Sequence, residues 1–266
     1  MTWIRFFQPL GVDFFCLGRK FLVYNLVSRN LKIKYRRSFI GVFWTLLNPI
    51  GMGLVYYFVF KLILNVQVPH YLAFILSGIL PWVFFSQSVM ENMESLVSNM
   101  GLISKVPTPI QVFPYVGTLT NLITLAFAVP VMIGAALISG VALNASLFLI
   151  LYYFVILFLT TYGLSLMLAI AFVYFRDLRH LIGIVMQIWF YMTPVIYAEH
   201  MIPEKYLWAV YLNPLGFLFS AMHGILAEGR WPSLLYLLQP AAWSIVILLA
   251  ALLVRKYLCN ELVEQI

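Results

Sequence analysis

The sequence predicts an all-α polytopic membrane protein with six transmembrane helices. Hydrophobic residues make up 64% of the 266 residues and charged residues only 9%, and the mean hydropathy is +0.97. A water-soluble fold of this length needs more charged residues to cover its exterior. Because one crossing takes about 20 apolar residues, the chain has room for about six crossings and little else. We therefore expect residues 1–266 to form a single transmembrane domain.

Six apolar runs mark the expected crossings. They cover residues 39–63, 71–90, 112–139, 146–174, 181–197 and 234–254. Basic residues gather in the leading segment, in the loops after the second and fourth runs and in the tail. The opposite side carries only Lys61, Lys205 and Arg230. By the positive-inside rule, both termini are therefore expected in the cytoplasm.

Residues 1–37 are expected at the cytoplasmic membrane surface. Within residues 13–35, apolar side chains recur at helical spacing: Phe14, Leu17, Phe21, Tyr24 and Leu31. This pattern predicts an amphipathic helix that lies in the interface. Two interpretations stay open: a membrane-surface anchor, or a helix that docks partly on protein and helps to seat a cytoplasmic partner.

A polar stretch over residues 91–109 forms the cytoplasmic loop after the second run. Residues 95–103 predict a short helix outside the hydrocarbon, closed off by Pro107 and Pro109. Glu91 and Glu94 are spaced so that both face the cytoplasm. The stretch is either an ordinary loop or a docking element for another protein.

Residues 198–230 differ from the rest of the chain. After Thr193-Pro194 the apolar runs are short and are interrupted by Pro203 and by Asn213-Pro214. Such segments cannot span a bilayer, and broken backbone is tolerated at membrane depth only where protein covers it. We expect re-entrant helices on the outer side, between the fifth and sixth spans.

The sequence lacks the common motifs of nucleotide binding, metal binding and hydrolysis. There is no phosphate-binding P-loop, no H-E-x-x-H, no C-x-x-C and no G-x-S-x-G, and the four histidines form no ligand set. Acidic residues avoid the expected membrane centre, whereas ion-coupled carriers usually need ionisable groups there. The chain is therefore expected to be neither an enzyme nor a metal protein, and to take its energy from a partner. Basic residues interleaved with apolar ones also argue against nucleic acid as a partner.

Five segments together carry a family resemblance, in order and at the family's spacing. They are Tyr35-Arg36-Arg37-Ser38-x-x-Gly41-x-x-Trp44-x-x-x-Asn48-Pro49, Leu102-Ile103-Ser104-Lys105-Val106, Tyr174-Phe175-Arg176-Asp177-Leu178, Thr193-Pro194-Val195-Ile196-Tyr197 and Asn213-Pro214-Leu215. With six predicted spans, the set resembles the membrane-spanning permease subunit of ABC exporters for cell-surface polysaccharides. The resemblance covers nearly the whole chain.

The resemblance implies one half of a homodimeric channel in the bacterial plasma (inner) membrane. Two copies of a separate ATP-binding subunit would hold ATP and Mg, so that this chain binds no cofactor itself. The substrate would be a polysaccharide on polyprenyl pyrophosphate, with O-antigen as the first candidate and teichoic acid or capsule as alternatives. The implied ATPase-coupling residues are Glu94, Ser95, Asn99, Leu102, Ile103 and Lys105.

Aromatic side chains are candidates for the substrate path because sugar rings pack their C–H faces on aromatic rings. The candidates are Phe39, Phe43, Trp44, Tyr56, Trp82, Phe85, Trp189 and Tyr191. The alternative for each is a place in the lipid-facing aromatic belt. Arg36 and Arg37 either attract the pyrophosphate at the cytoplasmic mouth or simply anchor the chain.

Five further residues are expected to have gating or structural roles: Asn48, Pro49, Arg176, Asp177 and Pro194. For Arg176 and Asp177 the alternative is a solvated loop. Two rival functions are kept: a permease of this architecture for drugs or lipids, and an integral-membrane lipid-linked sugar transferase. The transferase requires acids or histidines gathered near one membrane face, and the dispersed acids of this sequence argue against it.

Overall fold

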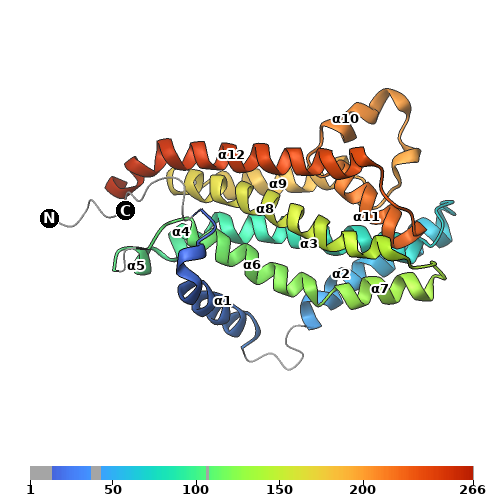
Figure 1. Ribbon diagram of the computed structural model, residues 1–266, viewed down its shortest axis with the longest axis horizontal. Coiled ribbons are helices and arrows are strands. Elements are labelled where there is room, and N and C mark those ends of the chain that lie inside the picture. The colour runs from blue at the N-terminus through green and yellow to red at the C-terminus, as the bar shows by residue number, and fades with distance from the viewer. Residues whose placement is uncertain (1–13, 37–42, 106–107, 266) are drawn as a thin grey trace.

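The computed structural model describes residues 14–36, 43–105 and 108–265. These residues form helices joined by loops, with no strand among them. The long helices run side by side along one axis (Figure 1). The predicted all-α polytopic fold is thereby confirmed.

Five helical segments among the described residues are long and apolar enough to span a membrane. In order, they are α2 (Phe43–Tyr56) continued by the π-helix η3 (Tyr57–Ile63), α3 (Tyr71–Met93), α6 (Val112–Ala126) with α7 (Val129–Ile138), η4 (Ala145–Phe148) with α8 (Leu149–Tyr174), and α12 (Leu234–Gln265). They correspond to the predicted crossings one, two, three, four and six.

The fifth predicted crossing, residues 181–197, is shorter in the structure. Helix α9 (Leu178–Met192) has 15 residues and is therefore about 22 Å long, less than the bilayer core of about 30 Å. Thr193 leaves the helix with extended backbone angles. The reason is Pro194, which disfavours helical backbone at the residue before it.

A sharply bent pair of helices separates α9 from α12. The short 3-10 helices η5 (Glu199–Met201) and η6 (Glu204–Tyr206) lead into α10 (Leu207–Leu212), and α11 (Gly216–Glu228) follows at a bend of 102°. Most of α11 is buried, as broken membrane segments require. The pair lies within residues 198–230, over which re-entrant helices are expected.

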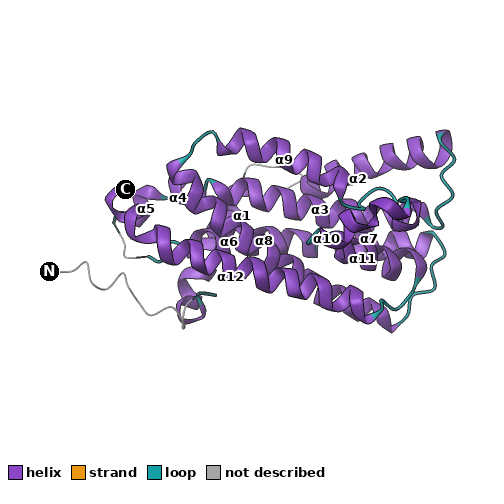
Figure 2. Ribbon diagram, turned by 90° about the horizontal axis from the view of Figure 1, so that it is seen from above, coloured by secondary structure: helices purple, strands orange, loops and turns teal. Residues whose placement is uncertain are grey.

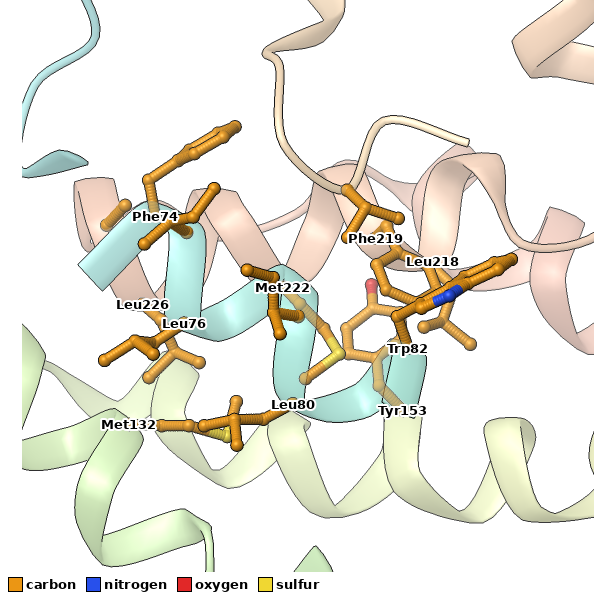
Figure 3. Packing of buried hydrophobic residues seen from close by; sticks show 14 of the residues in the cluster. Phe74, Leu76, Leu80, Trp82, Met132, Tyr153, Leu218, Phe219, Met222 and Leu226 are labelled. Carbon is orange, nitrogen blue, oxygen red and sulfur yellow. The ribbon is translucent and has the colours of Figure 1, made fainter. Parts of the chain in front are cut away.

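Helix α3 is the centre of the bundle. In its most apolar stretch 78% of the residues are buried, against 17% for α2 and for α12. Its side chains Leu76, Leu80 and Trp82 pack among residues from three other helices (Figure 3): Leu218, Phe219, Met222 and Leu226 of α11, Met132 of α7 and Tyr153 of α8. Helices α2 and α12 are therefore peripheral, with few fully buried residues.

The N-terminal helix α1 (Lys20–Tyr35) follows the 3-10 helix η2 (Leu17–Arg19) and lies against α6 (Figure 1). It docks through Val23, Leu26 and Val27, which are buried. Phe21 and Tyr24 of the predicted apolar stripe are instead 79% and 69% exposed. The helix thus has two apolar faces, one on protein and one free for lipid, because helical spacing alone does not say which face meets protein.

Candidate functional site

The predicted coupling loop lies at the end of the bundle where α12 ends (Figure 1). The structure replaces the single helix expected over residues 95–103 with two turns, α4 (Ser95–Ser98) and α5 (Met100–Ile103). Asn99 breaks the helix between them, since its backbone leaves the helical region. Pro107, the first predicted stop signal, lies outside the described residues.

The candidate coupling residues divide between an inner and an outer face. Ser95 and Ile103 are buried, and Leu102 is half-buried against the same cluster as Ile103. Lys105 is exposed, and Gly101 lies in open space where added side-chain atoms would meet nothing. The loop is therefore anchored on one side and exposed on the other.

An ion pair connects this loop to the start of α9. A guanidinium nitrogen of Arg179 lies 2.8 Å from a carboxylate oxygen of Glu94. The gating residues expected near this end of the chain's fourth span are Arg176 and Asp177. The Arg176 guanidinium instead lies 5.5 Å from the centre of the Phe172 ring. Arg179 was missed because spacing along the chain does not show which basic residue faces the loop; the gating roles of Arg176 and Asp177 stay predictions.

Helix α1 is tied to the same region by side-chain contacts. Arg29 donates to the Asn99 side chain at 3.1 Å, and Lys34 donates to Asn121 at 2.8 Å. Lys34 also lies 3.4 Å from Glu91 at the end of α3. Asn99 is therefore linked directly to α1 by a hydrogen bond.

A buried polar contact holds three helices together next to the loop. The side-chain amide of Asn92 on α3 donates to Thr118 of α6 at 2.9 Å and to Ser165 of α8 at 3.4 Å. Gly117 allows this approach, because a Cβ atom there would be 1.8 Å from the Asn92 carbonyl oxygen. Such polar contacts between membrane helices fix one arrangement of an otherwise apolar interface.

Helices α2 and α9 both contact α3, and in Figure 2 they lie along the same upper edge of the bundle. Two of the candidate path residues are exposed there: Trp44 of α2 is 58% exposed and Tyr191 of α9 is 60% exposed. Tyr56 is half-buried, with its ring 6.4 Å from that of Phe190. We call this edge, formed by the exposed side chains of α2 and α9, the α2–α9 face.

Other candidate path residues occupy different positions. Trp82 and Phe85 are buried in the core, only 7% and 0% exposed, and Trp189 is half-buried with its ring against Phe85. Arg36 is exposed. Arg37, Phe39 and the Phe43 side chain lie outside the described part of the chain. Of the gating candidates in α2, Asn48 is exposed and Pro49 is buried.

Asn213 holds the bend between α10 and α11. Its side-chain carbonyl accepts hydrogen bonds from the Trp189 indole at 2.9 Å and from the Leu215 backbone N–H at 3.0 Å. Its amide donates to the Thr193 hydroxyl at 2.8 Å. One buried side chain thus satisfies polar groups at the end of α9 and at the start of α11.

A second contact holds α11 against the turn after α9. One ring nitrogen of His223 lies 2.8 Å from the Pro194 carbonyl oxygen, and the other lies 2.8 Å from the Ser77 hydroxyl. Gly78 leaves room for the turn, since a Cβ atom there would be 2.2 Å from the Val195 carbonyl oxygen. Pro194 therefore follows the end of α9 and offers its carbonyl to His223, and its gating or structural role stays a prediction.

No group of three or more His, Cys, Asp or Glu residues in the described part of the chain is close enough to hold a metal ion. The acids are nevertheless less scattered than the sequence indicates. Glu199, Glu204 and Glu228 line one cavity at the end of the bundle away from the coupling loop. The argument from dispersed acids is wrong at this end, because the fold of the re-entrant region brings distant positions together.

Comparison with known proteins places the chain among transport permeases. The family described as ABC-2 type transporter matches residues 22–227. The chain is 34% identical to the O-antigen export system permease protein RfbA of Myxococcus xanthus, over 92% of this chain and 95% of the relative. It is 29% identical to RfbA of Klebsiella pneumoniae, over 81% and 85%, and 23% identical to the polysialic acid transport protein KpsM of Escherichia coli, over 79% and 85%.

Proposed function

Because the chain belongs to the ABC-2 type transporter family, we propose that it is the permease subunit of an ATP-driven polysaccharide exporter, with O-antigen as its substrate. The observation that carries this proposal is the 34% identity to an O-antigen export permease over 92% of the chain. The glycan would travel on polyprenyl pyrophosphate, from the cytoplasmic to the outer face of the inner membrane. Both termini and the coupling loop would then be cytoplasmic, as the distribution of basic residues predicts.

The energy would come from two copies of an ATP-binding subunit that binds ATP and Mg. This chain has no P-loop of its own, and the exposed side of α4 and α5 offers a surface for docking. A displacement of the loop would reach α9 through Glu94 and Arg179, and α1 through Asn99 and Arg29. These two contacts give ATP hydrolysis a mechanical route into the membrane part.

The translocation path would lie between two copies of the chain that meet at the α2–α9 face. Trp44 and Tyr191 stay exposed in the single chain, so they are free to contact a sugar ring in a dimer. Arg36 would attract the pyrophosphate at the cytoplasmic mouth, together with Arg37. Trp82 and Phe85 pack inside the single chain, so they would contribute by supporting the face.

Reconstitution tests the proposal. The chain and its ATP-binding subunit, in liposomes that contain O-antigen on polyprenyl pyrophosphate, should expose the glycan on the far leaflet only with ATP and Mg. The chain without its partner should neither hydrolyse ATP nor move the glycolipid. Rapid glycolipid movement by the lone chain without nucleotide would refute the proposal, and so would ATP-driven transport of unglycosylated lipid in preference to the glycolipid.

A further inference from the structure

An open cavity of about 560 Å³ lies at the end of the bundle away from α4 and α5. Its walls come from η5, η6, α11, the connection after α11 and the first turn of α12, all on the same side of Figure 1. The volume falls within the range of about 300–1,000 Å³ that is typical of small-molecule sites. The membrane topology proposed above places this cavity on the outer face.

Two aromatic side chains contribute to the cavity wall. Trp231, in the connection between α11 and α12, is 61% exposed. Tyr236 is held in place, since its hydroxyl donates to a Glu199 carboxylate oxygen at 2.9 Å and its ring packs 4.6 Å from that of Phe217. Two rings in the wall of one cavity offer surfaces for the C–H face of a sugar.

The polar groups of the wall suit sugar hydroxyls. The carboxylates of Glu199 and Glu204 can each accept hydrogen bonds from hydroxyl groups. Ser220 of α11 also belongs to the wall.

The charge of the wall disfavours anions. Three carboxylates, those of Glu199, Glu204 and Glu228, face one guanidinium, that of Arg230, which pairs with Glu228. Carboxylates therefore exceed the guanidinium by two. Like charges brought together in a partly desolvated site repel each other. A polymer rich in phosphate or carboxylate is therefore a poor ligand for this cavity.

We propose that the cavity is a saccharide subsite that holds neutral sugar residues of the exported chain as it leaves the membrane. The inference rests on the proposed function, and it narrows the substrate class to glycans of low negative charge. The aromatic pair and the carboxylates select sugars, and the excess negative charge rejects polyanionic polymers and the pyrophosphate of the carrier.

Binding to the intact complex tests this subsite. The complex of the chain with its ATP-binding subunit, in nanodiscs without nucleotide, is titrated with a neutral oligosaccharide released from the O-antigen and with an oligogalacturonate as the anionic probe. Saturation-transfer NMR and calorimetry report the two dissociation constants. The neutral probe should bind, and the anionic probe should bind at least about tenfold more weakly, a difference of about 1.4 kcal/mol.

Three variants sharpen the test. Trp231→Ala should weaken binding of the neutral probe about tenfold, whereas Trp208→Ala should leave it unchanged. Trp208 is the matched control because it is 60% exposed and does not line the cavity. Glu204→Gln removes one carboxylate at an exposed position and should improve binding of the anionic probe several-fold.

Absence of neutral-probe binding would overturn the inference, and so would equal affinity of the Trp231→Ala and Trp208→Ala complexes. Stronger binding of the anionic probe than of the neutral one would overturn it as well. If any of these results appears while the complex still exports O-antigen, the subsite is wrong and the proposed function stands. A complex that exports no polysaccharide under ATP would refute the proposed function itself.

Discussion

Asn213 holds the bend between α10 and α11, and the stability lost when its side chain is removed can be worked out from its hydrogen bonds. Asn213→Ala removes the acceptor of two donors, the Trp189 indole and the Leu215 backbone N–H. Each buried donor left without a partner costs about 1–3 kcal/mol. The loss of the contact with Thr193 adds no further cost, because the Thr193 hydroxyl still donates to the Trp189 carbonyl at 2.9 Å. We expect the free energy of unfolding to fall by about 2 kcal/mol or more.

Unfolding of the purified chain by sodium dodecyl sulfate in mixed micelles measures this loss. Asn48→Ala is the matched control, since Asn48 also precedes a proline in a membrane segment but is exposed, and it should change stability by less than about 0.5 kcal/mol. In a double-mutant cycle, Asn213→Ala and Trp189→Phe should be coupled by about 1 kcal/mol. If the two losses of stability are additive, or if Asn213→Ala loses no more than Asn48→Ala, Asn213 does not hold the bend through Trp189.

Three further predictions concern coupling, topology and the path. Glu94→Arg should reduce ATP-dependent export several-fold. The complex should still assemble, because an exposed ion pair contributes at most about 1 kcal/mol to stability. Adding Arg179→Glu should restore export, and a double variant that restores nothing would exclude a role for this pair. With the native cysteines replaced, a cysteine at His200 should react with an impermeant maleimide from outside the cell and one at Gly101 only after permeabilisation, and the opposite pattern would invert the topology. Trp44→Ala should slow export measured as surface O-antigen while subunit abundance is unchanged, whereas normal export would return Trp44 to the lipid belt.

The position of the polar loop over residues 91–109 could be predicted from local signals. The polar stretch over residues 91–109 stands out between apolar runs, and the structure places two short helical turns there. The partners of this loop could not be predicted. Glu94 pairs with Arg179 and Asn99 accepts from Arg29, and both partners are distant in the chain. A charge pattern shows that a loop is polar, but only the packing of α1 and α9 decides which charge each residue meets.

The candidate path shows the same limit for aromatic residues. Trp44 and Trp82 are both tryptophans in apolar runs, yet the first is 58% exposed and the second 7%. A membrane helix is apolar all round, so hydrophobic periodicity does not distinguish a side that faces lipid from a side that faces protein. The division of the aromatics between core and surface therefore required the arrangement of α2, α3 and α9.

Composition alone determined that this chain occupies a bilayer. The lengths of its apolar runs located the five long helical segments, since hydrocarbon thickness sets the length of a spanning helix. Pro194 and Pro214 likewise follow the ends of α9 and α10, because proline disfavours helical backbone at the residue before it. Tertiary structure alone decided that three glutamates share a cavity with Trp231 and that Asn213 holds the bend. Such contacts join residues that are far apart in the chain, and no local pattern encodes that distance.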